Sequence, residues 1–373
     1  MEEHMQEPQK SQVSEGPTDT QKKKRSMWKN VLLIIVEVSV LLLAVGVLYV
    51  VTRTTEEVER REIDEEKIII NEEVEQRIEE KEEGEKKGYR NIALFGVDAR
   101  DGKLDRGTRS DSIIIASINQ DTQEIKLISV FRDTFLNLSN DTYNKCNAAY
   151  AQGGPQQAIS MLNANLDLDI TDYVTIGFAG LIDAVDALGG VEMEVTDSEI
   201  SHLNNYQLCM AEELQVDYVP VEHSGVQLLN GMQATAYCRI RYTKGDDFRR
   251  AERQRDVLRA MMDKARDASM VELTDMVNSV LPQVETSLNV NEVLSVLGSV
   301  AGYEIVTSDG FPFEGNRLGV NVGSKGSCVV PDDLEGNVKL LHEALYPEEA
   351  YMPSRQVQNI SDEIAQLTEE YIE

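Results

Sequence analysis

Arginine side chains are concentrated in one short part of this 373-residue chain. Seven arginines lie between Arg239 and Arg259, in a protein with a formal net charge of −30. A guanidinium group binds phosphate oxygens through two parallel hydrogen bonds and keeps its charge when partly buried. Arg239 and Arg241 have the i, i+2 spacing of a strand, whereas Arg250 and Gln254 have the i, i+4 spacing of a helix. If the two pairs converge, these residues form a site for a phosphate or diphosphate.

A surface helix laced with ion pairs is the alternative interpretation of the same stretch. Four acidic residues lie between Arg239 and Arg259, and exposed arginines pair readily with such neighbours. We favour this interpretation for Arg249, Arg255 and Arg259. For the two converging pairs, both interpretations remain open at the level of sequence.

A second set of charged residues lies at the ends of apolar segments. Asp98 follows one such segment, Arg109 and Asp111 open the next, and Arg132 and Asp133 follow a third. Mg²⁺ needs only one or two carboxylates when phosphate supplies further oxygens. The spacing is therefore compatible with a metal ion and a diphosphate, although on spacing alone turns at strand ends with ordinary surface ion pairs are the favoured explanation.

Several other chemistries are excluded by the sequence. The four cysteines and four histidines show none of the spacings of zinc sites or redox pairs, and no G-x-x-x-x-G-K-[ST] phosphate loop or G-x-S-x-G nucleophile elbow occurs. The strong negative charge argues against a nucleic-acid partner, since such binding requires many Lys and Arg contacts to phosphate. Lys145, just before a predicted helix, is a weaker candidate for an anion contact.

Short apolar runs alternate with helical patterns from residue 89 onward, which predicts a layered α/β domain over residues 89–350. Strands are predicted at 91–97, 112–118, 124–130, 173–178, 191–195, 304–307 and 328–330. Helices are predicted at 148–152 continuing into 156–165, and at 179–188, 229–237, 248–268, 271–281, 293–300 and 334–345. An acidic tail with a loosely attached helix is expected at 351–373.

The N-terminal part is predicted to be a membrane anchor. A disordered cytoplasmic tail (1–30) carrying a basic cluster precedes an apolar run (31–52) of the length that spans a bilayer as a helix. The basic residues precede this run and acidic residues follow it, so the N-terminus is expected in the cytoplasm and the domain outside the cell. A cleaved signal peptide is the alternative. The charged segment 53–88 is interpreted as a solvated helical stalk, or else a short coiled coil.

Taken together, these segments resemble the LytR-CpsA-Psr family of cell-envelope phosphotransferases. The matching stretches, in order, are 92–98, 109–111, 128–134, 145–151, 153–154, 185–191, 229–234, 239–241 and 247–254. The chain departs from the family pattern at Phe131, where proline is common, and at Arg249, where a small residue is frequent.

The resemblance implies a three-layer α/β/α domain with a mixed central sheet, preceded by one transmembrane helix. It also implies transfer of a glycopolymer from a polyprenyl-diphosphate carrier to a peptidoglycan hydroxyl, with Mg²⁺ or Mn²⁺ as cofactor. By position, Asp98 and Asp111 match metal-associated carboxylates. The proposed catalytic residues are Arg109, Arg132 and Asp133, and the proposed substrate-binding residues are Lys145, Arg239, Arg241, Arg250 and Gln254.

Alternatives to this function remain at the level of sequence. A non-catalytic envelope sensor of lipid-linked diphosphates, or a polyprenyl-diphosphate hydrolase, would use the same residues. The general base stays open among Asp98, Asp111 and Asp133. The pairing of the cysteines is also open, with Cys209 and Cys238 as one option.

Overall fold

The computed structural model describes residues 67–372, apart from 82–87, 99–103, 105–106 and 242–245. The expected cytoplasmic tail (1–30) and membrane helix (31–52) lie outside the described residues. Within the described ranges, no helix combines the length and the apolar composition needed to cross a bilayer.

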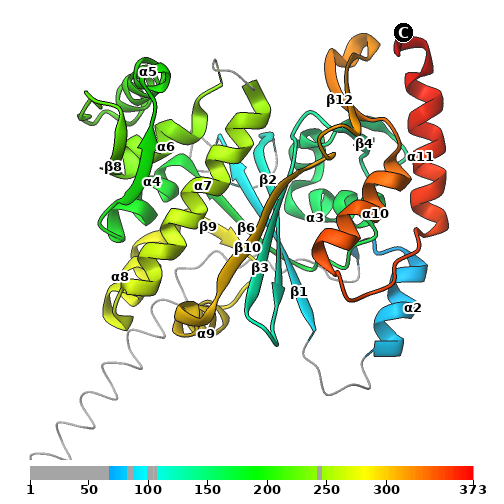
Figure 1. Cartoon of the computed structure of the whole chain (residues 1–373), viewed down its shortest axis with the longest axis horizontal. Coiled ribbons are helices and arrows are strands. Elements are labelled where there is room, and N and C mark those ends of the chain that lie inside the picture. Colours follow the sequence, from blue (N-terminus) through cyan, green and yellow to red (C-terminus); the bar gives the residue numbers. More distant parts are fainter. Residues whose placement is uncertain (1–66, 82–87, 99–103, 105–106, 242–245, 373) are drawn as a thin grey trace, which may run out of the picture. The chain divides into compact units, whose positions relative to one another are not determined.

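A mixed six-stranded sheet forms the centre of the domain (Figure 1), in the strand order β10-β3-β2-β1-β6-β9. Its strands are β1 (Tyr89–Val97), β2 (Ser110–Asn119), β3 (Glu124–Val130), β6 (Asp172–Gly177), β9 (Val284–Thr286) and β10 (Glu304–Phe311). β1 pairs antiparallel with β2 and parallel with β6, while β3 pairs antiparallel with β2 and parallel with β10. Helices lie on both faces of the sheet (Figure 1), so the expected α/β class with a mixed central sheet is confirmed.

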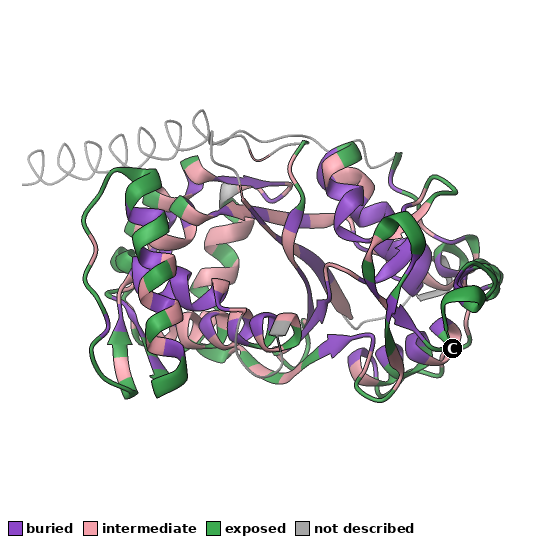
Figure 2. Ribbon diagram, turned by 90° about the horizontal axis from the view of Figure 1, so that it is seen from above, coloured by how far each residue is buried: buried purple, intermediate pink, exposed green. Residues whose placement is uncertain are grey.

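One face of the sheet is packed against the largest apolar core. Phe95 of β1 and Ile113 and Ile115 of β2 belong to this core, which also contains side chains of α3 (Asn147–Leu166), α10 (Leu334–Leu345) and α11 (Arg355–Thr368). Buried residues follow the strands and the inner sides of these helices (Figure 2). The same core also contains Phe311 of β10, Ile128 of β3 and Tyr173 of β6, so this face is packed from β10 to β6.

The opposite face is filled less completely. Leu94 and Ile114, each next in the chain to a residue of the main core, belong to much smaller apolar clusters. Successive side chains of a strand point to opposite faces. Leu94 and Ile114 therefore lie on the opposite face of the same strands, and that face is covered less completely. The helices on this side are α4 (Phe178–Ala187), α5 (Asp197–Leu214), α6 (Gly231–Arg239), α7 (Asp246–Asp267), α8 (Met270–Val280) and α9 (Val290–Gly298).

Several of these helices form a separate apolar core with a β-hairpin. The hairpin consists of β7 (Val191–Val195) and β8 (Gly225–Leu229), and Leu203 of α5, Tyr237 of α6 and Val257 of α7 pack with it. Two further hairpins are β4 (Phe135–Asn137) with β5 (Tyr143–Lys145), and β11 (Arg317–Asn321) with β12 (Ser327–Pro331). Short 3₁₀ turns are η2 (Leu281–Gln283), η3 (Val300–Gly302), η4 (Gly323–Lys325) and η5 (Glu369–Tyr371). This second core stabilises the packing of these helices against one another and against the β7–β8 hairpin.

The two ends of the described chain are fastened to each other and to the main core. Asn71, which precedes α2 (Glu72–Lys81), donates a hydrogen bond from its side chain to the buried Asp167 carboxylate. The same carboxylate accepts hydrogen bonds from the Tyr351 hydroxyl and from both the backbone N–H and the hydroxyl of Ser354. Residues 67–81 therefore pack onto the folded domain and are not a solvated stalk in that part.

The C-terminal segment 351–373 is likewise more firmly attached than its sequence indicates. Val357, Ile360 and Ile364 of α11 are at most 2% exposed and belong to the main core. The expectation of a loosely attached helix is wrong, because these apolar residues recur at the spacing of one helix face. The acidic residues that suggested a tail occupy the other face.

A buried histidine makes this side of the domain sensitive to acid. His342 of α10 is 7% exposed, donates from Nε2 to the Leu166 carbonyl oxygen at 2.9 Å, and stacks on Tyr351. Burial lowers the pKa of His342 from 6.5 to about 4. The unfolded chain therefore binds this proton more tightly than the folded protein.

We expect the free energy of unfolding to be highest above pH 6.5 and to fall as the pH decreases towards 4, by up to roughly 3 kcal/mol from this group alone. Urea unfolding at several pH values measures it. His342→Gln should flatten this dependence, whereas His223→Gln, at a side chain that is 88% exposed, should leave it unchanged. Equal pH dependence in wild type and His342→Gln would contradict the assignment.

Candidate active site

A cavity of about 530 Å³ lies between the less filled face of the sheet and helices α4, α6 and α7. Its apolar walls come from the sheet and from the facing helices. They include Leu94, Ile114, Val174, Ile176, Leu181, Val257, Leu258 and Met261. The volume falls in the range of roughly 300–1,000 Å³ that small-molecule sites occupy. The cavity can therefore hold an apolar ligand against the middle of the sheet.

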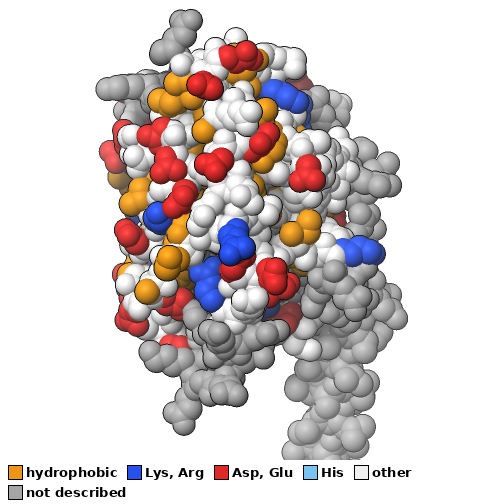
Figure 3. All heavy atoms as spheres, turned by 90° about the vertical axis from the view of Figure 1, so that its right-hand side faces the viewer, with side chains coloured by type: hydrophobic (Ala, Val, Ile, Leu, Met, Phe, Trp, Pro, Cys, Tyr) orange, Lys and Arg blue, Asp and Glu red, His pale blue; other side chains and the backbone are white. Residues whose placement is uncertain are grey.

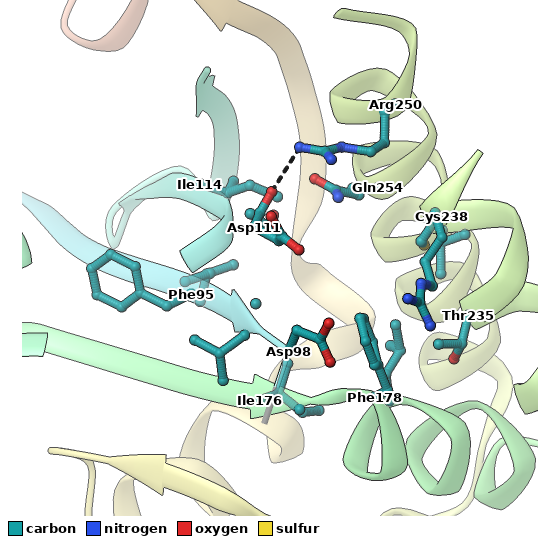
Figure 4. A pocket seen from close by; sticks show the side chains of 18 of the residues that line it. Phe95, Asp98, Asp111, Ile114, Ile176, Phe178, Thr235, Cys238, Arg250 and Gln254 are labelled. Carbon is teal, nitrogen blue, oxygen red and sulfur yellow. Dashed lines mark hydrogen bonds between the residues drawn. The ribbon is translucent and has the colours of Figure 1, made fainter. Parts of the chain in front are cut away.

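Two carboxylates project into this cavity from neighbouring strand ends (Figure 4). Asp98 follows the last residue of β1 and Asp111 is the second residue of β2, and the antiparallel register pairs Val97 with Ser110. Strand pairing alone brings the two carboxylates to one edge of the sheet, as the sequence indicated. Both line the cavity.

Three arginines surround Asp111 and a further carboxylate, Asp247. Arg132 Nη1 lies 2.5 Å from Asp111 Oδ1, and its Nη2 lies 3.6 Å from Asp247 Oδ2. Arg241 lies 3.8 Å from the Asp111 carboxylate and 3.4 Å from that of Asp247. Arg250 Nη1 is 3.3 Å from Asp247 Oδ1, and Nη2 donates to the backbone carbonyl of Asp111 at 3.0 Å (Figure 4). We call Arg132, Arg241, Arg250, Asp111 and Asp247 the charge cluster.

The charge cluster contains more positive charge than its carboxylates compensate. Burial, and after it the adjacent charge of Arg132, lowers the pKa of Arg250 to about 10. Burial acts in the same direction on Arg132, but the carboxylates of Asp111 and Asp247 outweigh it and raise the pKa of that guanidinium. Arg250 Nε and Arg132 Nε are buried without a hydrogen-bond partner among the described residues. The cluster is thus suited to an anion.

Arg239 reaches the same cavity by a different route. Its guanidinium carbon lies 4.2 Å from the centroid of the Phe178 ring and 5.4 Å from that of Tyr206. Nη1 is buried without a hydrogen-bond partner in the described part of the chain. Aromatic rings that hold a cation leave its N–H donors free for a ligand. Arg239 therefore adds a fourth positive charge to the cavity wall.

The prediction that Arg239 and Arg241 lie on a strand is wrong, although both residues line the cavity. Arg239 is the last residue of α6, and Ile240 has extended backbone angles that end the helix. The turn after the helix, rather than a strand, brings both guanidinium groups to one side. For Arg250 and Gln254 the expected helix spacing holds, since both lie on α7 and line the cavity.

Three predicted site residues lie away from the main cavity. Arg109 is exposed and does not line it. Lys145, on β5, places Nζ 3.1 Å from Asp133 Oδ1, and neither residue lines the main cavity. Asp133 instead lines a second, smaller cavity on the other side of the charge cluster. The structure thus brings together Asp98, Asp111, Arg132, Arg239, Arg241, Arg250 and Gln254.

Helix α7 is fixed in position by a buried ion pair behind the cavity. Arg253 is 1% exposed, and its Nη2 lies 2.7 Å from Glu199 Oε1 of α5. Burial alone would raise the pKa of Glu199, but hydrogen bonds from Thr196 and Arg253 lower it overall. Arg249 pairs with Glu252 at 2.6 Å, as the ion-pair interpretation predicted. Arg255 is buried and donates to Ser308 of the sheet instead.

Sequence reasoning missed the role of Asp247, which it assigned to surface ion pairs. Its position three residues before Arg250, on the same face of a helix, could have indicated this role. It also missed the aromatic residues Phe178 and Tyr206, which no spacing rule connects to Arg239. All four cysteines are free, so the option of a Cys209–Cys238 disulfide is wrong.

The carboxylates present fit a hard divalent cation only with help from a ligand. No group of three or more His, Cys, Asp or Glu side chains able to hold a metal occurs among the described residues. Asp98 and Asp111 offer oxygen donors at one edge of the cavity, and Mg²⁺ accepts one or two carboxylates when phosphate oxygens and water complete its shell. The donor set therefore fits Mg²⁺ or Mn²⁺ together with a diphosphate.

Comparison with known proteins identifies the family. Residues 46–324 match the LytR_cpsA_psr family. The chain is 29% identical over 232 residues to the polyisoprenyl-teichoic acid–peptidoglycan teichoic acid transferase TagV of Bacillus subtilis, covering 61% of this chain and 57% of that protein. It is 30% identical over 220 residues to the transferase TagU of Oceanobacillus iheyensis, covering 57% and 63% respectively. The chain thus spans less than two thirds of the length of each relative.

A solved structure shares the fold. The crystal structure of B. subtilis TagV superposes with a TM-score of 0.54 at 27% identity, over 72% of this chain and all of the other. The family match covers most of the chain, including β1 to β11. The chain belongs to the LytR_cpsA_psr family.

Proposed function

We propose that this protein transfers a glycopolymer from a polyprenyl-diphosphate carrier to a hydroxyl of peptidoglycan. The observation that carries the proposal is an apolar cavity of about 530 Å³ that ends in four arginines. A prenyl chain requires the apolar walls, and its diphosphate requires the arginines. The relatives TagV and TagU are named as transferases that move teichoic acid from a polyisoprenyl carrier to peptidoglycan, which supports the same reaction class here.

The charges of the site favour a diphosphate diester. Among the described residues, Arg132, Arg239, Arg241 and Arg250 supply four positive charges against three carboxylates, Asp98, Asp111 and Asp247. A further carboxylate, Asp133, lies 3.7 Å from Arg132 and is compensated by Lys145 at 3.1 Å. The excess is one positive charge, and a divalent cation on Asp98 and Asp111 increases it to three. A diphosphate diester carries two negative charges and largely neutralises this excess, whereas an uncharged lipid leaves it buried at high cost.

Asp98 and Asp111 would hold Mg²⁺ or Mn²⁺ in this proposal. When bound, the ion would neutralise charge on the diphosphate oxygens as the phosphoryl group transfers. The arginines orient the diphosphate and stabilise its charge without rearrangement, since their positions are already fixed by Asp111 and Asp247.

In the transfer step, the acceptor hydroxyl oxygen forms a bond to the phosphorus that carries the glycan. The bond from that phosphorus to the bridging oxygen breaks, and polyprenyl phosphate leaves with the electron pair. The hydroxyl proton passes to a carboxylate and then to water. Asp133 is the carboxylate we assign to this role, because Asp98 and Asp111 would hold the metal ion.

A membrane anchor at residues 31–52, with the domain outside the cell, is part of the same proposal. Its support is the apolar run after the basic cluster. Peptidoglycan, the acceptor named for the relatives, lies on that side of the membrane.

Removing an arginine of the site should reduce transfer far more than it reduces stability. We expect Arg239→Ala to lower kcat/KM by about 10²–10³-fold, the loss typical of one charge-stabilising donor. Incubation with a lipid-linked glycan, Mg²⁺ and peptidoglycan fragments, followed by mass spectrometry, measures it. Arg259→Ala is the matched control, because Arg259 is exposed and lines neither cavity.

The products of the same assay separate the proposed function from its alternatives. A phosphodiester-linked conjugate identifies a transferase. Free phosphorylated glycan identifies a hydrolase, and an unchanged donor identifies a sensor. Wild-type turnover in Arg239→Ala would contradict the role of the charge-lined cavity.

Metal removal gives an independent test. We expect EDTA to abolish transfer and added Mg²⁺ or Mn²⁺ to restore it. Asp98→Asn should need at least about tenfold more Mg²⁺ for half-maximal rate, since it weakens one of two ligands. Asp263→Asn, at a side chain that is 60% exposed on α7, is the control. Full activity after exhaustive chelation would refute the metal assignment.

A further inference from the structure

A second cavity of about 190 Å³ adjoins the main one and shares a wall with it. The shared wall contains Arg132, Arg250, Gln254 and Asp111, which line both cavities. Ser112 also lines both cavities, whereas the other residues of the second cavity do not line the main one. The residues found only here include Ser129, Phe131, Asp133, Phe248, Gly319 and Ser327. A group held in the second cavity therefore faces the charge cluster from its other side.

We propose that this second cavity binds one sugar ring of the peptidoglycan acceptor and directs its hydroxyl at the diphosphate. The proposal rests on the function proposed above, and it assigns the acceptor site of that reaction. In-line phosphoryl transfer places the attacking and leaving oxygens on opposite sides of phosphorus. With the prenyl phosphate in the main cavity, an acceptor in the second cavity meets this requirement.

The chemistry of the lining suits a neutral sugar. Ser129 is 2% exposed, and its hydroxyl has no hydrogen-bond partner among the described residues. Asp133 lines the same cavity, and Lys145 compensates its charge at 3.1 Å. A buried hydroxyl without a partner costs free energy unless a ligand or water satisfies it. Sugar hydroxyls both donate and accept, so they satisfy both groups.

An aromatic wall of fixed position completes the cavity. The rings of Phe131 and Phe248 meet edge to face at 4.6 Å, and the Arg317 guanidinium carbon lies 3.9 Å from the Phe248 centroid. Phe131 packs so closely on Gly310 that a Cβ there would lie 2.2 Å from its ring. Phe248 remains 36% exposed. Arg317 also lies 4.9 Å from the Phe131 centroid, so the exposed part of the Phe248 ring is the apolar surface that can meet the C–H face of a sugar ring without prior reorganisation.

The size of the cavity limits what it can hold. At about 190 Å³ it is smaller than the roughly 300–1,000 Å³ typical of sites for drug-sized ligands. It accommodates a single ring and not a second lipid chain. The polymer beyond that ring must lie outside the cavity.

Gly319 offers a way to block this cavity alone. It lines the second cavity and not the first, and a Cβ at this position meets no atom within 4 Å. Its partner across the β-hairpin is Val329, which also lines the cavity. Directly paired residues of antiparallel strands point to the same side, so a side chain at position 319 enters the cavity beside Val329.

We expect Gly319→Tyr to raise KM for a soluble peptidoglycan oligosaccharide by at least about tenfold. The Kd for a synthetic polyprenyl-diphosphate-linked N-acetylglucosamine should stay within about twofold of wild type. Both constants are measured on the full-length protein in detergent. Gly298→Tyr is the matched control, since position 298 is also exposed and open but lies on α9. Ser129→Ala, a smaller change, should raise the same KM without altering donor binding.

Binding of the oligosaccharide alone, followed by saturation-transfer NMR, separates this proposal from the proposed function. If wild type forms no conjugate, the transferase function fails, yet oligosaccharide binding that Gly319→Tyr abolishes still establishes the second cavity as a sugar site. Unchanged acceptor KM and unchanged oligosaccharide binding in Gly319→Tyr would overturn the proposal. Equal weakening of donor and acceptor would overturn it as well.

Discussion

The structure of the site depends on the pairing of Arg132, Arg241 and Arg250 with the carboxylates of Asp111 and Asp247. Burying three guanidinium groups close together is unfavourable, because each loses hydration and repels the others. The two carboxylates offset most of this cost and fix the geometry. These ion pairs also link the end of β3, the start of β2 and the start of α7. The contacts that shape the ligand site therefore fix three elements relative to one another. Because this cluster is largely shielded from water, it attracts the negative charge of a ligand strongly.

The cavity itself follows from how the two faces of the sheet are covered. On one face, α3, α10 and α11 share the main core with Phe95 and Ile115. On the other, α5 and α6 pack with the β7–β8 hairpin in a core of their own. Helix α7 is then held by the buried pair of Arg253 with Glu199, and its apolar side faces the sheet across a gap. A protein that needed only stability would close this gap, since filling cavities is favourable.

Much of this could be predicted from the sequence, and the failures have physical causes. The strands 91–97 and 124–130 lie within β1 and match β3, because both are buried apolar runs bounded by turn residues. Asp98 and Asp111 were correctly placed together, since strand pairing acts locally between neighbours. The convergence of Arg239 was predicted for the wrong reason, because i, i+2 spacing does not distinguish a strand from the turn after a helix.

The features that could not be predicted depend on contacts between residues far apart in the chain. Helix α5 and the hairpin β4–β5 carry no strong periodicity and are fixed by what packs on them. Of the β11–β12 hairpin, only the strand at 328–330 was predicted, and it lies within β12. The Asp167 carboxylate accepts hydrogen bonds from Tyr351 and Ser354, which lie far from it in the chain. Local sequence does not show these contacts, so the acidic C-terminal helix was predicted to be loosely attached. The second cavity arises only where β3, α7 and the β11–β12 hairpin meet.

The distribution of charge bears on which ligands the cavity can take up. Its formal charge is −30, and acidic side chains are spread over the face shown in Figure 3. Exposed charges are screened beyond roughly 8 Å at physiological ionic strength, whereas buried ones are screened much less. In the proposed function, a diphosphate joined to a prenyl chain gains about 0.8 kcal/mol for each buried CH₂ group, which favours its entry into an apolar cavity that ends in arginines.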